Sequence, residues 1–136
     1  MLMEQTGASE SKLKCYYAHS MHIYGSLQEA RDMTLLEKLG FAVINPSEKS
    51  FAAAYETWKK ANPYERAMRY FEDCVMSCDV VAFRAHIDGK IPSGVGAELE
   101  AALKVGIPVI ELPSLVSGRM LSLKDTVEYL KLNGQR

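Results

Sequence analysis

The sequence predicts an α/β domain with a doubly wound, mainly parallel sheet of four to five strands and helices on both faces. Three observations predict it. Apolar runs alternate with amphipathic helical segments, the linkers between them are short, and some runs are continuous, as in strands covered on both faces. Residues 1–12 are small and polar and are expected to form a flexible tail, which leaves residues 13–136 as a single domain.

In the first part of the chain, residues 15–18 are β-prone and form the first predicted strand. Ser26 and Glu29 have the spacing of a capping box, in which each side chain satisfies a free amide at a helix start. The helix that follows ends at Gly40, which suits a left-handed cap, and residues 41–44 form the second strand.

Two helices are predicted before the third strand. Residues 51–60 form the first, and Asn62 is expected to cap the second, with Pro63 at its first helical position. The second helix has the clearest apolar periodicity in the chain. Its stripe consists of Tyr64, Ala67, Met68, Phe71, Cys74, Val75 and Cys78.

In the last part of the chain, residues 80–83 form the third strand and residues 107–110 the fourth. A helix opens at Ser93, and Ser122 is expected to cap the last helix. The buried side chains expected of the helix at Ser93 are Val95, Leu99, Ala102 and Leu103.

The composition excludes several classes of function. Lys and Arg number 16 and Asp and Glu 17, so the net charge of −1 predicts no nucleic-acid partner. No apolar run approaches the roughly 18 residues that span a bilayer, and the N-terminal residues lack the apolar core of a secretory signal. Three cysteines favour reduced thiols in a cytoplasmic protein, and no ligand spacing predicts a metal site.

Ligands of doubly wound sheets bind beyond the carboxyl ends of the strands, which directs attention to two segments. Ser93, Gly94 and Gly96 open a helix whose amides and dipole suit a phosphate, although such glycines also serve tight turns. Glu98 is expected in the first turn of that helix. There the dipole would lower its pKa and keep it ionised as a nucleophile or ion-pair partner, or Glu98 would simply complement the dipole.

The second segment follows the first strand. Alternation places Tyr16 and Ser20 on one face of the strand and His19 on the other. Together with His22, these polar side chains could bind a phosphate or sugar hydroxyls. The alternative is that the histidines are hydrogen-bonded structural residues.

The blocks at residues 16–21, 78–82 and 92–99 resemble the nucleoside 2-deoxyribosyltransferase superfamily, and most closely its deoxynucleoside 5′-monophosphate N-glycosidase branch. A further block, residues 117–122, resembles a late segment of that branch. The resemblance extends over most of the chain from Tyr16 to Ser122. It implies a flavodoxin-like or Rossmann-like sheet, a nucleotide substrate without a cofactor, and a homodimer whose active site is completed across the interface.

The resemblance also implies roles for individual residues. Glu98 matches the carboxylate that attacks the anomeric carbon to give a glycosyl-enzyme ester, and Tyr16 matches a tyrosine beside it. Ser122 matches a serine that reaches the phosphate from the neighbouring subunit, unless it is only a helix cap. The residues expected to bind substrate are His19, Ser20, Met21, His22, Ser93, Gly94, Gly96 and Ser122.

The chain departs from the pattern of this family at three positions. His19 stands where the family usually has Gly, and His22 where it often has Arg. Counted back from the strand at residues 80–83, the catalytic Asp of the family falls on Phe71. Glu72 would reach that place only through a helical irregularity such as a π-bulge. His19, His22, Tyr70 or water are the other candidates for protonating the leaving base.

The sequence therefore predicts hydrolysis of the N-glycosidic bond of a (2-deoxy)nucleoside 5′-monophosphate through a Glu98 intermediate. Two alternatives remain open. One is base exchange between nucleosides, and the other is a module that binds or senses a nucleotide without turning it over.

Overall fold

The computed structural model describes residues 12–86, 88–113 and 120–135. Its four strands form one parallel sheet in the order β3-β2-β4-β5, which confirms the predicted fold class. The strands are β2 (Lys14–Ala18), β3 (Ala42–Ile44), β4 (Val80–Phe83) and β5 (Val109–Glu111). The helices are η2 (Met21–Ile23), α1 (Leu27–Lys38), α2 (Lys49–Ala61), α3 (Ala67–Met76), α4 (Ser93–Lys104) and α5 (Leu123–Leu132). The expected tail, residues 1–12, lies outside the described residues apart from Lys12.

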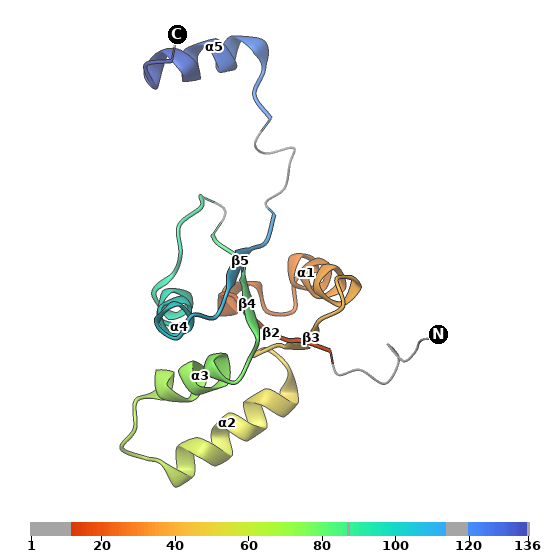
Figure 1. The fold of residues 1–136 in the computed structure, drawn as a ribbon, viewed down its shortest axis with the longest axis vertical. Coiled ribbons are helices and arrows are strands. Elements are labelled where there is room, and N and C mark those ends of the chain that lie inside the picture. Colours follow the sequence, from red (N-terminus) through yellow and green to blue (C-terminus); the bar gives the residue numbers. More distant parts are fainter. Residues whose placement is uncertain (1–11, 87, 114–119, 136) are drawn as a thin grey trace.

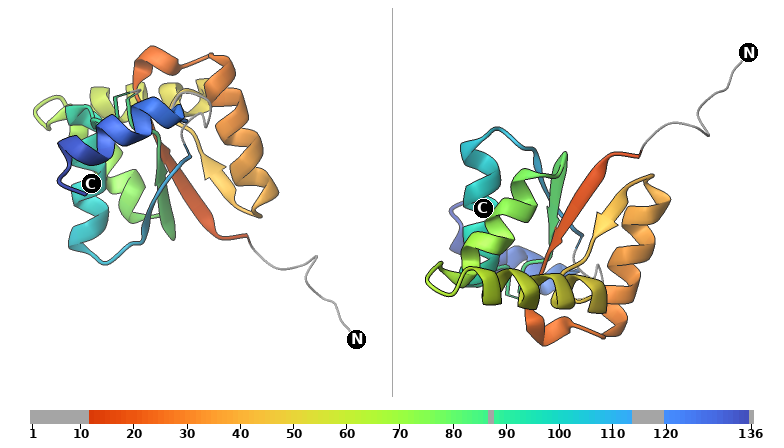
Figure 2. Two further views of the ribbon diagram at one scale, coloured as in Figure 1. Left: turned by 90° about the horizontal axis from the view of Figure 1, so that it is seen from above. Right: turned by 90° about the horizontal axis from the view of Figure 1, so that it is seen from below.

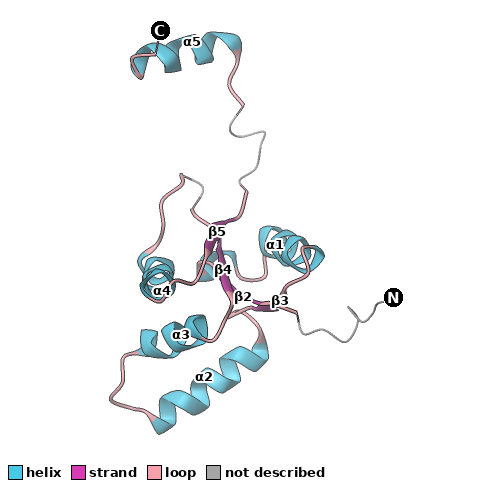
Figure 3. Ribbon diagram, viewed as in Figure 1, coloured by secondary structure: helices cyan, strands magenta, loops and turns pink. Residues whose placement is uncertain are grey.

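Helices cover both faces of the sheet. α1 lies on one side, and α2, α3 and α4 lie on the other (Figures 1 and 2), so that the sheet is the middle layer (Figure 3). The chain passes from β2 outward to β3 and then returns across β2 to β4, and this reversal creates a switch point between β2 and β4. The segments that follow these two strands therefore meet at the carboxyl edge, where ligands of such sheets bind.

Side chains of β2 alternate between two hydrophobic clusters, as the sequence predicts. Tyr16 and Ala18 belong to the cluster under α3 and α4, whereas Cys15 and Tyr17 belong to the one under α1. Tyr16 pairs in register with Val81 of β4. The two faces of one strand thus serve different layers of the protein.

A buried ion pair between Asp32 and Arg84 connects α1 to the sheet. Asp32 of α1 accepts hydrogen bonds from the Tyr17 hydroxyl at 2.5 Å and from Arg84 Nε at 3.0 Å. Arg84 also donates to the carbonyl of Pro113 at 2.6 Å, so it connects α1 to the end of β4 and to the segment after β5. Because each charge has its partner, this network can be buried without an uncompensated ion.

The predicted start of the third long helix is wrong. α3 begins at Ala67, and the side-chain amide of Asn62 instead donates back to the carbonyl of Trp58, at the end of α2. Asn62 therefore caps the preceding helix rather than opening the next. Tyr64, which was expected on the apolar stripe, lies in the intervening turn and is fully exposed.

The buried face of α4 is rotated relative to the prediction. Val95, Leu99 and Ala102 are buried as expected, but Leu103 is 64% exposed and Glu98 is only 7% exposed. Since successive helical residues are about 100° apart, Glu98 and Leu103 lie on opposite edges of this face. α4 therefore buries the edge that carries Glu98 and exposes the edge that carries Leu103.

The other differences from the prediction are small. β5 begins at Val109, two residues later than expected. Ser26 and Ser122 cap their helices as predicted, each accepting a backbone hydrogen bond at 3.1 Å. Among the described helices, none combines the length and apolar character that crossing a membrane requires.

Candidate active site

Tyr16 and Glu98 form a buried pair between β2 and α4. Tyr16 is completely buried, Glu98 is 7% exposed, and the tyrosine hydroxyl donates a hydrogen bond to Glu98 Oε2. The register of β2 points Tyr16 toward α4, and the rotation of α4 points Glu98 toward the strand. The pairing that the resemblance implies is thus present as a direct contact.

Burial raises the pKa of Glu98 to about 7; the hydrogen bond from Tyr16 opposes this rise, and the charge of Glu72 adds to it. The expectation that the helix N-terminus lowers this pKa is wrong. Glu98 is the sixth residue of α4, beyond the first turn over which a helix dipole acts strongly. Near neutral pH the carboxyl group is therefore present in both its charged and its neutral form.

Glu72 is the second carboxyl group of this site. It lies on α3, and its charge is one of the causes that raise the pKa of Glu98. Every residue of α3 is in regular α-helix, so this helix has no π-bulge that would bring Glu72 to the place of the catalytic Asp of the family. Phe71 instead packs its ring 5.7 Å from that of Phe51 and 5.3 Å from that of Tyr55.

Tyr24 is a site residue that the sequence analysis missed. Burial raises its pKa to about 12, and the charges of Glu98 and Glu29 add to this rise. Its ring centroid is 4.9 Å from that of His19. Tyr24 follows the short helix η2, where no periodic pattern marks a buried side chain, and the sequence therefore carried no signal for it.

Both ring nitrogens of His19 contact other groups of the same chain. Its ring stacks on Tyr17 at 3.7 Å, with Nδ1 2.9 Å from the carbonyl of Tyr17 and Nε2 2.6 Å from Glu29 Oε2. A carbonyl and a carboxylate are both acceptors, so each ring nitrogen of His19 faces a hydrogen-bond acceptor inside the chain. A substrate contact through His19 would require one of these hydrogen bonds to break.

Glu29 has a different role from the one its capping box predicts. Its carboxylate accepts from the amide of Gly25 at 3.0 Å as well as from His19. Burial acts to raise the pKa of Glu29, but hydrogen bonds from Ser47, His19 and Gly25 outweigh it and lower that pKa. Glu29 therefore stays ionised and fixes the turn between β2 and α1.

Ser20, Met21 and His22 line the exposed turn after β2. Ser20 Oγ accepts from the amide of His22 at 3.2 Å and lies 2.9 Å from its Nδ1. Met21 is 76% exposed, and His22 is also exposed. These side chains occupy the carboxyl edge of the sheet and remain accessible to a ligand.

The start of α4 offers fewer free amides than expected. The amide of Gly96 donates to the carbonyl of Pro92 at 2.8 Å, so it belongs to the helix itself. The first amides of a helix, here those of Ser93, Gly94 and Val95, have no partner within the helix. A side chain added at Gly94 would meet no atom within 4 Å, which leaves open space beside these amides.

Ser122 is not brought to the site of its own chain. It caps α5, which stands apart from the sheet (Figure 1). Three members of the resemblance block at residues 117–122, Ser117, Gly118 and Arg119, lie outside the described residues. One chain therefore brings Tyr16 and Glu98 into contact. It also places the predicted residues after β2 and at the start of α4 at the carboxyl edge of the sheet, whereas Ser122 lies away from that edge.

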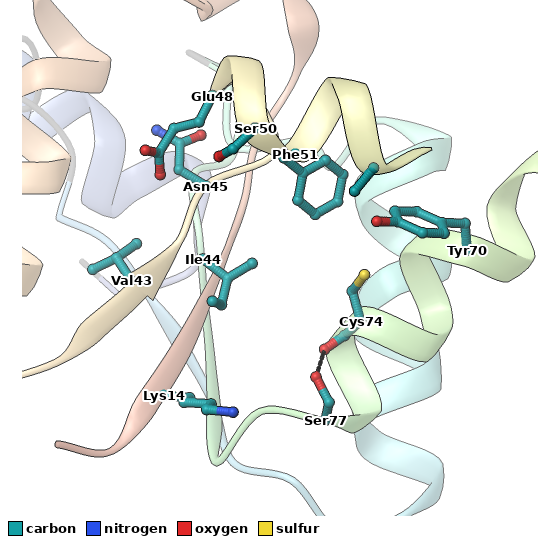
Figure 4. Close-up of a pocket in the computed structure, with 11 residues that line it drawn as sticks. Lys14, Val43, Ile44, Asn45, Glu48, Ser50, Phe51, Tyr70, Cys74 and Ser77 are labelled. Atoms are coloured by element: carbon teal, nitrogen blue, oxygen red, sulfur yellow. Dashed lines mark hydrogen bonds between the residues drawn. The ribbon is translucent and has the colours of Figure 1, made fainter. Parts of the chain in front are cut away.

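A cleft of about 330 Å³ lies next to this site, between α2, α3 and β3. Figure 4 shows Asn45, Glu48 and Ser50 at one end of it and Lys14 and Ser77 at the other. The remaining lining residues are Val43, Ile44, Phe51, Ala54, Tyr70 and Cys74. Ile44, Phe51 and Cys74 of this lining pack against the buried cluster that contains Tyr16, so the cleft borders the element that carries the site.

Within the described ranges, no three His, Cys, Asp or Glu side chains are grouped so that they could hold a metal ion. No family model, curated protein or solved structure matches this chain. The function is therefore inferred from the site itself.

We expect Glu98→Gln to stabilise the protein at pH 8, raising Tm by about 5 °C, and to have little effect at pH 5. The pKa of Glu98 rises on folding from its usual 4.5 to about 7, so its contribution to stability is present in full below 4.5 and is lost as the pH rises through 7. Glutamine mimics the protonated group at every pH. Thermal melts at both pH values measure the effect.

Glu100→Gln is the matched control, because Glu100 lies on the same helix and is exposed. Equal changes in Tm for the two variants at pH 8 would contradict the burial of Glu98.

Proposed function

We propose that this protein hydrolyses the N-glycosidic bond of a (2-deoxy)nucleoside 5′-monophosphate to the free base and the sugar 5-phosphate. One observation carries the proposal: Glu98 is a buried carboxyl group hydrogen-bonded by Tyr16, with a pKa of about 7 and a second carboxyl group, Glu72, within electrostatic range. Retaining glycosidases use two carboxyl groups that lie in different environments.

In the first step, an ionised Glu98 oxygen attacks C1′ of the sugar as the C1′–N bond to the base breaks. The electron pair of that bond passes to the base nitrogen, which takes a proton from an acid. The product is a glycosyl ester of Glu98 and a neutral free base. Tyr16 keeps its hydrogen bond to Oε2 and holds the carboxylate in position.

Water bound to the Glu72 carboxylate is the proposed acid. The other candidates are less suited to the task, because His19 uses both ring nitrogens inside the chain and Tyr70 packs in the aromatic cluster of α2 and α3. The Glu72 side chain is 20% exposed, so a base that leaves toward solvent can reach it. An acid at this position would replace the Asp that Phe71 lacks.

In the second step, the hydroxide left by the first step attacks C1′. The bond between C1′ and Glu98 breaks, which restores the ionised Glu98, and one water molecule is consumed overall. These steps use only carboxyl groups and water, and the proposed activity therefore has no cofactor. An acceptor base in place of water would give the exchange reaction.

The phosphate is proposed to lie at the carboxyl edge, against the free amides of α4 and the hydroxyls of Ser20 and Ser93. Helix amides favour an anion at this position. Three cysteines free of disulfides and a nucleotide substrate favour a cytoplasmic location.

The proposed active unit is a homodimer in which Ser122 of one copy completes the phosphate site of the other. α5 has ten residues and stands apart from the sheet, with Leu123 83% and Leu132 88% exposed. An isolated helix of this length is marginal in water, so a partner surface would stabilise it.

Substituting Leu123 and Leu132 together by Glu is expected to convert the dimer into a monomer and to abolish base release. Analytical ultracentrifugation measures the change. Leu39→Glu, at an exposed leucine after α1, is the control and should leave the dimer intact. A wild-type protein that sediments with the mass of one chain would contradict the dimer.

The activity is tested by incubating the protein with a panel of ribo- and deoxyribonucleoside 5′-monophosphates and measuring base release by chromatography. Wild type and Glu100→Ala should release base, whereas Glu98→Ala should be slower by roughly 1,000-fold or more. Release that requires an added acceptor base would indicate the exchange reaction. Binding without release from any substrate would indicate a sensor and would refute the hydrolase.

The pH profile tests the role of Glu98. Since the nucleophile must be ionised, kcat/KM should rise as the pH passes through about 7. Tyr16→Phe removes a hydrogen bond that favours the carboxylate. The rise in kcat/KM should therefore occur at a pH that is higher by roughly one unit.

Tyr17→Phe is the control for this shift, because Tyr17 bonds Asp32 on the opposite face of the strand. This variant should leave the pH at which kcat/KM rises unchanged. A profile that only falls through pH 7 would show that Glu98 acts as an acid and not as the nucleophile.

A further inference from the structure

A line of interacting polar groups runs from the core to the surface of this site. Tyr16 bonds Glu98, the charge of Glu72 reaches Glu98, and Arg66 Nη2 donates to Glu72 Oε1 at 3.0 Å. The Arg66 side chain is 68% exposed, so it forms the solvent end of this line.

A phosphate at this site faces an electrostatic difficulty. The proposed site contains the carboxyl group of Glu98, which already feels the charge of Glu72, and a phosphate dianion brought next to ionised carboxyl groups is repelled. The free amides of α4 supply only partial positive charges. His19 is committed to Glu29, and His22 lies on the turn after β2. A full positive charge is needed at the mouth of the site.

Arg66 has the geometry to supply that charge. It precedes α3 with an extended backbone and does not cap the helix with its side chain. Its one side-chain hydrogen bond within the described residues is the bond to Glu72. A guanidinium carries five N–H donors in a planar fork, so the others remain able to bind two phosphate oxygens.

Arg69 provides a contrast one turn further along. Its guanidinium lies 3.6 Å from Glu65 and 3.6 Å from Asp73, and both pairs are exposed. The side chains of these two carboxylates are 48% and 49% exposed, whereas that of Glu72 is 20% exposed. Arg69 therefore has the same chemistry as Arg66 without the connection to the site.

We propose that Arg66 is a specificity-determining residue that recognises the 5′-phosphate and so distinguishes a nucleotide from a nucleoside. The inference rests on the proposed function for its substrate class. Without substrate, Arg66 pairs with Glu72. With substrate bound, the guanidinium forms charge-assisted hydrogen bonds to the phosphate while it remains beside Glu72.

The test compares binding of a 2′-deoxynucleoside 5′-monophosphate and of the same 2′-deoxynucleoside, for each common base, by calorimetry. Glu98→Gln serves as the background, because it cannot form the ester and so allows binding to be measured without turnover. Adding Arg66→Gln should weaken nucleotide binding by about 10–100-fold and change nucleoside binding by less than about 3-fold. Adding Arg69→Gln should change neither.

Activity gives a second reading that separates this inference from the proposed function. In the otherwise unchanged protein, Arg66→Gln should lower the ratio of kcat/KM for nucleotide to that for nucleoside by a similar factor. If wild type binds nucleotides but releases no base, the hydrolase is wrong and the binding data still decide the role of Arg66. Equal losses for nucleotide and nucleoside, an unchanged nucleotide affinity, or no nucleotide binding at all would each overturn the inference.

Discussion

The site depends on one costly interaction, the burial of the Glu98 carboxyl group against Tyr16. A carboxylate removed from water loses its solvation, and a single tyrosine hydroxyl restores only part of it, which is why the pKa stays near 7. The contact requires both the face of β2 that Tyr16 occupies and the rotation of α4 that turns Glu98 inward. A register slip of one residue in β2 would point Tyr16 to the other layer and leave the carboxyl group without its donor.

The opposite face of the same strand holds Tyr16 in place. Tyr17 bonds Asp32, which is paired with Arg84, and His19 stacks on Tyr17 while it bonds Glu29. In this layer the buried Asp32 is paired with Arg84 and Glu29 is hydrogen-bonded to His19, whereas Glu98 is bonded by the neutral hydroxyl of Tyr16. Adjacent residues of β2 therefore contact different environments: Tyr17 faces a charge-paired network, and Tyr16 faces a carboxyl group with a raised pKa.

Local patterns were sufficient to predict the alternation of strands and helices, the caps at Ser26 and Ser122, and the faces of β2. They failed where a choice depends on tertiary contacts. Asn62 suits the end of one helix as well as the start of the next, and in the structure it ends α2 while α3 begins at Ala67. The pKa of Glu98 was predicted in the wrong direction, because the desolvation that raises it comes from packing between separate elements. Tyr24 and Arg66 are connected to the site through space, and no spacing in the sequence joins them to it.

The raised pKa of Glu98 also determines what must accompany a charged substrate. A phosphate placed near Glu98 would favour its protonated form and remove the nucleophile at the moment of binding, just as the charge of Glu72 already does in part. A cation that binds both the phosphate and Glu72 reverses this effect, because it offsets the two negative charges that oppose ionisation of Glu98. Arg66 is placed to do so from the solvent side, without entering the core. The proposed recognition of the phosphate and the ionisation of the nucleophile are thus two consequences of a single charge.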